Sequence, residues 1–249
     1  MTGLPRVAVL GLDAATAAAA ISLVDGGLMV ALFAPAPAAP DDIAPLAAYG
    51  CADRLTTLVP PSLRLSAAGP GAPPFHIHGT PAEGEARTPT QTTGTDTGAG
   101  ADAEPLGTFE AVVLNADTEH LLPRTLTQAS TRASTEADAQ ADSEPAGSAR
   151  PPRFGGVFDS QAAWVFHVGG PPELAAAQGR WIGEYLRGRY ALPLPTPHGR
   201  GRPRRAGVRG ALAELDRELL AGHVRAATAG YPLPTPSAWP TTIAPTTEA

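Results

Sequence analysis

The chain has 249 residues, enough for one large or two small domains, but its 28 prolines, 27 glycines and 5% aromatic residues favour a folded part shorter than the whole. Its formal net charge of −6 argues against a nucleic acid or an anionic membrane as partner, and its 18 basic residues are all arginine, which reflects compositional bias before any binding adaptation. A single cysteine, Cys51, excludes an internal disulfide and a thiolate metal cluster, so we expect a reducing, cytoplasmic setting.

The N-terminal segment predicts a strand, a helix and a second strand. Val7 to Leu10 is an apolar, β-branched run typical of a strand buried on both faces of a parallel sheet. Residues 14–24 are rich in alanine and predict a helix, which the Asp25-Gly26-Gly27 turn ends before a strand at Leu28 to Phe33. The stretch 14–34 is long enough for a transmembrane helix, but the glycine pair in its middle argues against one. The segment is therefore a βαβ unit.

The turn after the first strand normally carries the chemistry of such a unit. In the dinucleotide fingerprint, three glycines make the turn, let the backbone approach the pyrophosphate and allow close helix packing. The corresponding residues here are Gly11, Asp13 and Thr16, so only the first glycine is present. A carboxylate at Asp13 would cost about 4 kcal/mol beside a phosphate charge, at about 4 Å and an effective dielectric constant of about 20. Ala34 stands where an acidic residue usually holds the ribose.

Two segments of the chain, 69–105 and 127–152, have the composition of low-complexity, disordered insertions. Both are rich in glycine, proline, threonine, alanine and acidic residues. Within the first, His76 and His78 would share one face of an extended segment, as metal ligands sometimes do, but no acidic or cysteine partner lies nearby. We therefore favour a flexible loop there.

Further regular elements are predicted along the rest of the chain. The expected strands are Leu106 to Leu114 and Trp164 to Val168, and Leu55 to Leu65 is expected to form another short strand or a turn. The expected helices are 42–48, 172–189 and 210–226. The arginine-rich residues 198–209 join the last two helices and contain no interleaved aromatic residue, which favours a solvated linker over a phosphate or nucleic-acid site. Residues 231–249 are expected to form a disordered tail.

No catalytic residue can be assigned from the sequence. His167 precedes the glycines after the last strand and is either a structural histidine, the favoured interpretation, or an acid or base that faces a bound ring. Cys51 has no identifiable neighbouring base that would make it a nucleophile.

The sequence from Val165 to Pro193 resembles the C-terminal strand and helix of the flavin-containing monooxygenases. The shared features are a strand ending in Gly169-Gly170, a Gln178-x-Arg180-Trp181 pattern, and a closing Leu-Pro at residues 192–193. Residues 109–114 and 155–158 resemble two further islands of the family, its strand before an Ala-Thr-Gly turn and the approach to its last strand. The resemblance implies an FAD-dependent oxidoreductase of the monooxygenase type, in which the strand ending in glycine reaches the flavin.

Two departures from the family bear on the cofactors. Asn115-Ala116-Asp117 replaces the Ala-Thr-Gly turn, so Asp117 is a second carboxylate at a cofactor-facing turn. Between Ala34 and Phe109 we expect no strand, glycine fingerprint and helix of the kind that binds NADPH in the family. The resemblance thus implies FAD while the substitutions argue against its binding, and NADPH is not expected. Reduction of a flavin would then need a partner protein that supplies electrons or the missing domain.

We therefore expect one α/β domain over residues 1–230, with a Rossmann-like FAD-binding three-layer fold and a mostly parallel sheet on which the three main helices pack. The candidate cofactor-binding residues are Gly11, Leu12, Asp13, Thr16, Asp117, Gly169, Gly170 and Gln178. No metal site is expected. Two functions stay open: a monooxygenase-like oxidoreductase relative with a degraded FAD site and reduced or lost activity, and a non-catalytic interaction or scaffold protein that keeps only the fold.

Overall fold

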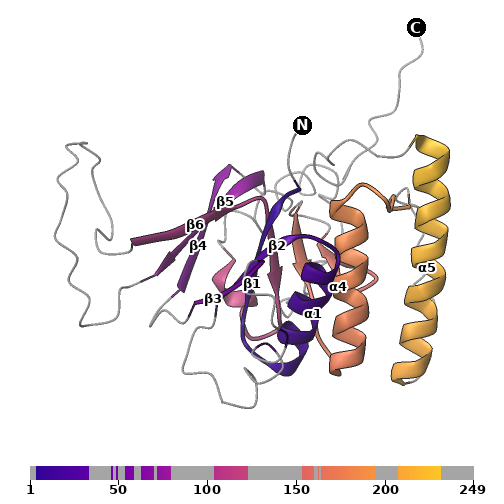
Figure 1. The fold of residues 1–249 in the computed structure, drawn as a ribbon, viewed down its shortest axis with the longest axis horizontal. Coiled ribbons are helices and arrows are strands. Elements are labelled where there is room, and N and C mark those ends of the chain that lie inside the picture. Colours follow the sequence, from indigo (N-terminus) through magenta and orange to yellow (C-terminus); the bar gives the residue numbers. More distant parts are fainter. Residues whose placement is uncertain are drawn as a thin grey trace, which may run out of the picture.

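The computed structural model describes residues 4–33, 46, 49, 54–58, 63–69, 72–79, 104–122, 153–159, 162, 164–193 and 207–230. Its strands are β1 (Arg6–Leu10), β2 (Met29–Phe33), β3 (Leu55–Leu58), β4 (Leu63–Gly69), β5 (Ala72–Gly79), β6 (Glu104–Phe109), β7 (Ala111–Leu114), β8 (Arg153–Phe154), β9 (Phe158–Asp159) and β10 (Val165–His167). The helices are α1 (Ala14–Asp25), the short η1 (Glu119–Leu121), α4 (Pro172–Leu186) and α5 (Val208–Ala229). Figure 1 shows a layer of helices, a large central sheet and a small second sheet. The α/β fold predicted from the sequence is confirmed.

Strand β1 is an inner strand of the large sheet, whose order is β3-β2-β1-β7-β10-β9-β8. It pairs in parallel with β2 on one side and with β7 on the other, so that Val9 lies opposite both Leu32 and Val113. β3 and β10 extend the parallel part, while β9 and β8 close one edge in antiparallel pairing. Because β1 is covered on both faces, its apolar run is almost completely buried, as expected for a central parallel strand.

The second sheet corrects several sequence predictions. It is antiparallel, in the order β4-β5-β6, and β5 lies inside the segment 69–105 that composition predicts to be disordered. Phe75 and Ile77 are fully buried while His76 and His78 between and beside them are half-buried, so a short alternating strand is hidden in the surrounding low-complexity sequence. The expectation of a flexible loop at the histidine pair is therefore wrong.

The expected single strand from Leu106 to Leu114 is in fact two strands in two different sheets. β6 belongs to the small sheet and β7 to the large one, with Glu110 between them. Phe33 at the end of β2 meets Phe109 at the end of β6 edge to face, with 5.5 Å between ring centroids. The chain thus bends at Glu110, and the small sheet packs on the large one through aromatic side chains.

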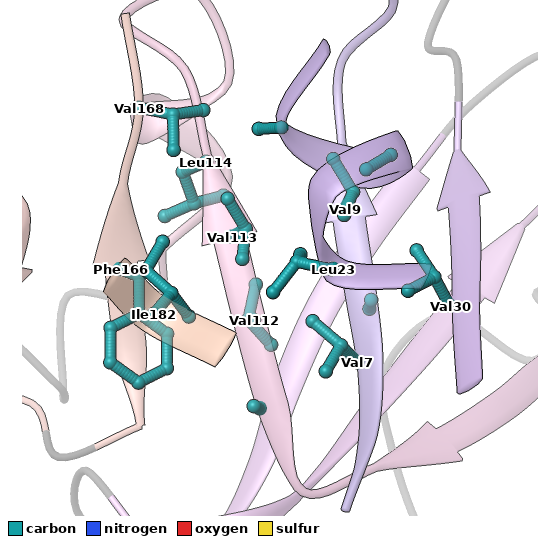
Figure 2. Close-up of a cluster of buried hydrophobic side chains, with 14 of the residues drawn as sticks. Val7, Val9, Leu23, Val30, Val112, Val113, Leu114, Phe166, Val168 and Ile182 are labelled. Carbon is teal, nitrogen blue, oxygen red and sulfur yellow. The ribbon is translucent and has the colours of Figure 1, made fainter. Parts of the chain in front are cut away.

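Helices α1 and α4 cover the same face of the large sheet. Figure 2 shows their side chains Leu23 and Ile182, both fully buried, among the valines of β1 and β7. The two helices approach closely because Gly179 of α4 lies against the backbone of α1, where a Cβ atom would come within 2.6 Å of the Ala19 carbonyl oxygen. The small residues of α1 therefore serve helix–helix contact as well as contact with the sheet.

Helix α5 packs on α4 and not on the sheet, which corrects the expectation that all three helices lie on the sheet (Figure 1). Gly222 of α5 leaves room for the ring of Tyr190, whose hydroxyl donates a hydrogen bond to Glu218 at 2.8 Å. The apolar face of α5 is buried against α4 and against the segment that follows α4. The spacing of apolar residues in α5 shows that one face is buried but does not show which element covers that face.

Other sequence predictions lie outside the described residues. These are the insertion 127–152, the linker residues 198–206, the tail 231–249, Cys51, and the helix 42–48 apart from Leu46. The single-domain boundary at residue 230 stays a prediction. None of the helices in the described ranges is both long and apolar enough to cross a membrane.

The close contact of α1 with α4 gives a prediction on stability. Gly179→Ala should lower the free energy of unfolding by about 1–3 kcal/mol, because the new methyl group meets backbone atoms of Ala19 that can move only with the helix. In the control Gly183→Ala, on the same helix, the Cβ would lie 3.8 Å or more from its nearest neighbours, so stability should stay equal or rise. Urea unfolding measures both variants, and equal effects would contradict the close packing.

Candidate functional site

The C-terminal ends of β1, β7 and β10 lie side by side in the middle of the large sheet. From β1 the chain continues to β2 on one side, whereas the later strands β7 and β10 lie on the other side, so the strand order reverses here. Open α/β sheets bind their ligands in the crevice at such a point. All the sequence-predicted site residues lie in the segments that follow these three strands.

Asp13 is the N-cap residue of α1 and holds the first turn of that helix with its own side chain. Its Oδ1 accepts hydrogen bonds from the Thr16 backbone N–H at 2.6 Å and from the Thr16 hydroxyl at 2.9 Å. The Asp13 backbone N–H in turn donates to Thr16 Oγ1 at 2.8 Å, which completes a capping box. The start of a helix is also where a phosphate binds in a dinucleotide site. The Asp13 carboxylate therefore lies where such a phosphate would bind.

Asn115, the first residue after β7, reaches across the crevice to Asp13. Its Nδ2 donates a hydrogen bond to Asp13 Oδ2 at 2.9 Å, across 102 residues of sequence. Gly11 makes room for this side chain: its φ is +110°, and a Cβ there would lie 2.9 Å from Asn115 Nδ2. The glycine that opens the crevice in dinucleotide-binding proteins thus accommodates an asparagine side chain here.

Thr118 holds the Asn115 side chain in place and connects it to the end of β1. Its hydroxyl lies 3.0 Å from the Leu10 carbonyl oxygen at the end of β1 and 2.8 Å from Asn115 Oδ1. The Thr118 backbone N–H also donates to Asn115 Oδ1, at 3.0 Å, so the carboxamide is held at both of its ends. Sequence reasoning missed Asn115 and Thr118, although an Asn-x-x-Thr turn directly after a buried strand is a recognisable signal.

The hydrogen bonds to Asp13 decide its protonation state. Burial raises its pKa and is the largest single effect, but hydrogen bonds from the Thr16 backbone, the Asn115 and Thr16 side chains and the Ala15 backbone together lower it by more. The net pKa lies below the ordinary value of 3.8. Asp13 is therefore charged at neutral pH and repels an anion placed in the crevice.

After the third strand, β10, the side chain of Gln178 in α4 accepts a hydrogen bond from a backbone N–H that precedes the helix. Its Oε1 accepts a hydrogen bond from the Gly169 N–H at 2.9 Å. Gly170 has a φ of +87°, which makes the turn into α4. Apart from Gly169 and its two chain neighbours, no atom of the described residues lies within 4 Å of the position that a Cβ would take there. The structure thus brings two of the candidate residues, Gln178 and Gly169, together through a hydrogen bond within the chain.

Leu12 and Asp117 lie apart from this network. Leu12 is half-buried and packs against the hydrophobic core. Asp117 is exposed in the turn after β7, where its backbone oxygen lies 2.6 Å from His120 Nδ1. Of the two carboxylates predicted from the sequence to lie at the site, Asp13 faces the start of α1 and Asp117 does not. The turn after β7 contributes Asn115 to the network instead.

His167 belongs to a buried polar cluster at the end of β10. Its Nε2 lies 3.1 Å from Asp159 Oδ2, and its Nδ1 lies 3.6 Å from Glu119 Oε1. Arg153 donates to the same Glu119 oxygen at 2.9 Å. Only 3% of His167 is exposed. These contacts tie η1 and the β8–β9 hairpin to the parallel strands, which favours the structural interpretation of this histidine.

The two histidines His76 and His78 lie on one face of β5 with 6.4 Å between ring centroids. His78 Nε2 is 3.0 Å from the Ser66 hydroxyl, and His76 Nδ1 is 3.3 Å from the Thr108 hydroxyl. Within the described ranges, no group of three histidine, cysteine or acidic side chains is placed to hold a metal ion. The pair therefore joins the strands of the small sheet.

The residues at the crevice do not fit the diphosphate of FAD. The Thr16 N–H and the Asn115 amide, which could donate to a phosphate, already donate to the Asp13 carboxylate. The Gly169 N–H donates to Gln178. A phosphate group would find a negative charge where donors are needed, so no chemical step is assigned to a flavin here.

No protein-family model and no curated protein sequence matches the chain. Among solved structures, it is similar to S-allyl-L-cysteine S-oxygenase from Allium sativum, with 11% sequence identity and a TM-score of 0.42. That alignment covers 91% of this chain and 83% of the other. A likeness of this size identifies no family.

The Asp13 network gives a prediction on stability and its pH dependence. Asp13→Ala should lower the free energy of unfolding at pH 7 by about 0.5–2 kcal/mol, because the helix loses its cap. Since folding lowers the pKa of Asp13, its carboxylate stabilises the fold above the ordinary value of 3.8, and this contribution disappears as the pH falls through the folded pKa. The difference between native and variant protein should therefore vanish in acid.

Asp117→Ala is the matched control, because it removes an exposed carboxylate from the neighbouring turn. It should leave the unfolding free energy unchanged within about 0.5 kcal/mol. Urea titrations from pH 7 down to about pH 2, below the range in which a carboxylate with a lowered pKa is protonated, measure all three proteins. A difference between native protein and Asp13→Ala that is independent of pH would contradict the role of the carboxylate.

Proposed function

We propose that this chain is a relative of the flavin-containing monooxygenases whose FAD site is filled by its own side chains, and that it acts as a non-catalytic binding or scaffold protein. On this proposal the dinucleotide-binding fold persists for its shape and stability. The chain does not transfer electrons through a bound flavin, and it does not bind NADPH as a reductant.

One observation carries the proposal: the Asp13 carboxylate accepts hydrogen bonds from both the start of α1 and Asn115. A phosphate would have to break these bonds and remain beside a half-buried negative charge. The cost of that contact alone, about 4 kcal/mol at an effective dielectric constant of about 20, corresponds to roughly three orders of magnitude in affinity. The site is thus better suited to hold the fold together than to hold a cofactor.

The C-terminal sequence supports the proposed ancestry. Gln178 points back to the glycine after β10 and bonds its N–H, so this part of the resemblance corresponds to a defined contact. Trp181, from the same pattern, is 2% exposed and packs on Phe158 of β9, with 4.8 Å between ring centroids. Both side chains have structural partners in this chain, which is compatible with descent from an enzyme and with loss of its activity.

A second function keeps a specific observation in its favour. Among the described residues, no side chain beyond its chain neighbours lies within 4 Å of the position that a Cβ would take at Gly169, which leaves one approach to the ends of the strands open. A reduced flavoprotein that holds a flavin from this side would take its electrons from a partner protein, because the described residues between β2 and β7 lie mostly in strands. Binding of a flavin by the native protein distinguishes this function from the first.

The direct test is an absorption spectrum of the purified native protein, before and after addition of FAD and removal of the unbound excess. We expect no flavin bands between about 350 and 500 nm in either sample. Bands at one flavin per chain would overturn the proposed function and favour the reduced flavoprotein.

Variants test whether Asp13 and Asn115 are the obstacle. The double variant Asp13→Gly with Asn115→Ala removes both side chains from the crevice and should bind FAD at least about tenfold more tightly than the native protein, measured by flavin fluorescence. Asp117→Gly, in the same turn, should leave FAD binding unchanged because its carboxylate is exposed.

Asp13→Asn adds a variant that keeps a good helix cap while it removes the charge. If circular dichroism shows that the double variant is unfolded, the single Asp13→Asn variant still reports the effect of the charge on FAD affinity. FAD binding by Asp117→Gly alone would show that the crevice has been placed at the wrong turn residue.

A further inference from the structure

Helix α5 exposes large apolar side chains on the face turned away from α4. Leu220 is 66% exposed and Val224 is 60% exposed, more than any other large hydrophobic residue in the described part of the chain. The two lie one helical turn apart, so they form a continuous apolar surface. Figure 1 places α5 outermost in the helical layer, beyond α4.

The exposed face of α5 is symmetric about Leu220. Ala213 precedes it and Ala227 follows it by seven residues, close to two helical turns, so the three side chains lie on one line along the helix. Both alanines are exposed. A two-fold axis at Leu220, with a second α5 antiparallel to the first, places each Ala213 opposite the partner's Ala227. Self-complementarity of this kind is what an isologous interface requires, and the small residues let the helices approach.

The charges beside this line are complementary under the same two-fold axis. Asp216 and His223 lie on one side of the line, and the axis brings each Asp216 next to the partner's His223. The Asp216 side chain is 62% exposed and its ion pair with Arg180 is at the surface, so it can accept a second donor. His223 already lies 3.1 Å from Glu184 of α4 and is 40% exposed. Carboxylate and imidazole thus meet without a like-charge contact.

On the other side of the line, Arg217 faces the partner's Val224, and its aliphatic stem can cover that exposed side chain. A parallel arrangement of two α5 helices would instead place the exposed Arg209 beside the partner's Arg209. Two guanidinium groups at that position would repel each other. The charge pattern therefore favours the antiparallel arrangement.

We propose that α5 is a self-association surface, on which a second copy of this chain docks antiparallel with the two-fold axis at Leu220. One helix face is smaller than a standard interface of about 1,600 Å², so the dimer is weak and forms at high protein concentration. The inference does not depend on the proposed function, since α5 lies outside the cofactor crevice.

Cross-linking tests the geometry in the full-length chain, with Cys51→Ser as background. Leu220→Cys should form an intermolecular disulfide on mild oxidation with oxidised glutathione, because the axis brings the two copies of this position together. Ala213→Cys should not, because the two copies of that position lie about 21 Å apart along an antiparallel pair, at 1.5 Å per residue. Thr228→Cys, exposed but away from the line, measures random collision.

Sedimentation of the native chain tests the association itself. The weight-average mass should rise with concentration, and Leu220→Asp should weaken the association at least tenfold while the thermal unfolding curve stays unchanged, because this side chain is exposed. A native protein that stays monomeric up to about 1 mM, roughly 4 kcal/mol of binding, would overturn the proposal. Cross-linking of Ala213→Cys at the rate of Leu220→Cys would overturn the antiparallel arrangement.

Discussion

The contact between the Asp13 carboxylate and its donors is the interaction on which the centre of this fold depends. It caps α1, joins that helix to the turn after β7 through Asn115, and acts together with the bond from Thr118 to the end of β1. The same atoms would have to be free for a phosphate to bind. The same hydrogen bonds therefore stabilise the middle of the sheet and fill its ligand crevice.

The parts of the fold that the sequence predicts correctly are those with long, uniform patterns. The apolar runs of β1 and β7 and the alanine-rich α1 indicate a parallel sheet with a close-packed helix, and this prediction does not depend on which strands are neighbours. The small sheet escaped prediction because β5 alternates over few residues within glycine- and proline-rich sequence. Its stability comes from pairing with β4 and β6 and from the Phe33–Phe109 contact, and these are properties of the folded chain.

The site was predictable to a similar extent. Asp13 and Thr16 replace the glycines of a known fingerprint, so their position at the start of α1 follows from local sequence. Asn115 comes from another strand, and its bond to Asp13 spans 102 residues, which no local pattern encodes. Sequence comparison with the Ala-Thr-Gly turn drew attention to Asp117 instead, but the turn carries that side chain to the surface.

The central claim is that the first turn of α1 has an internal anion in place of a phosphate. Backbone amide resonances of Ala15 and Thr16 and the side-chain amide of Asn115 report this directly, because all three donate to Asp13. NMR spectra of the native protein with an excess of FAD should show these resonances unchanged. Saturable shifts of the three resonances on addition of FAD would contradict the account.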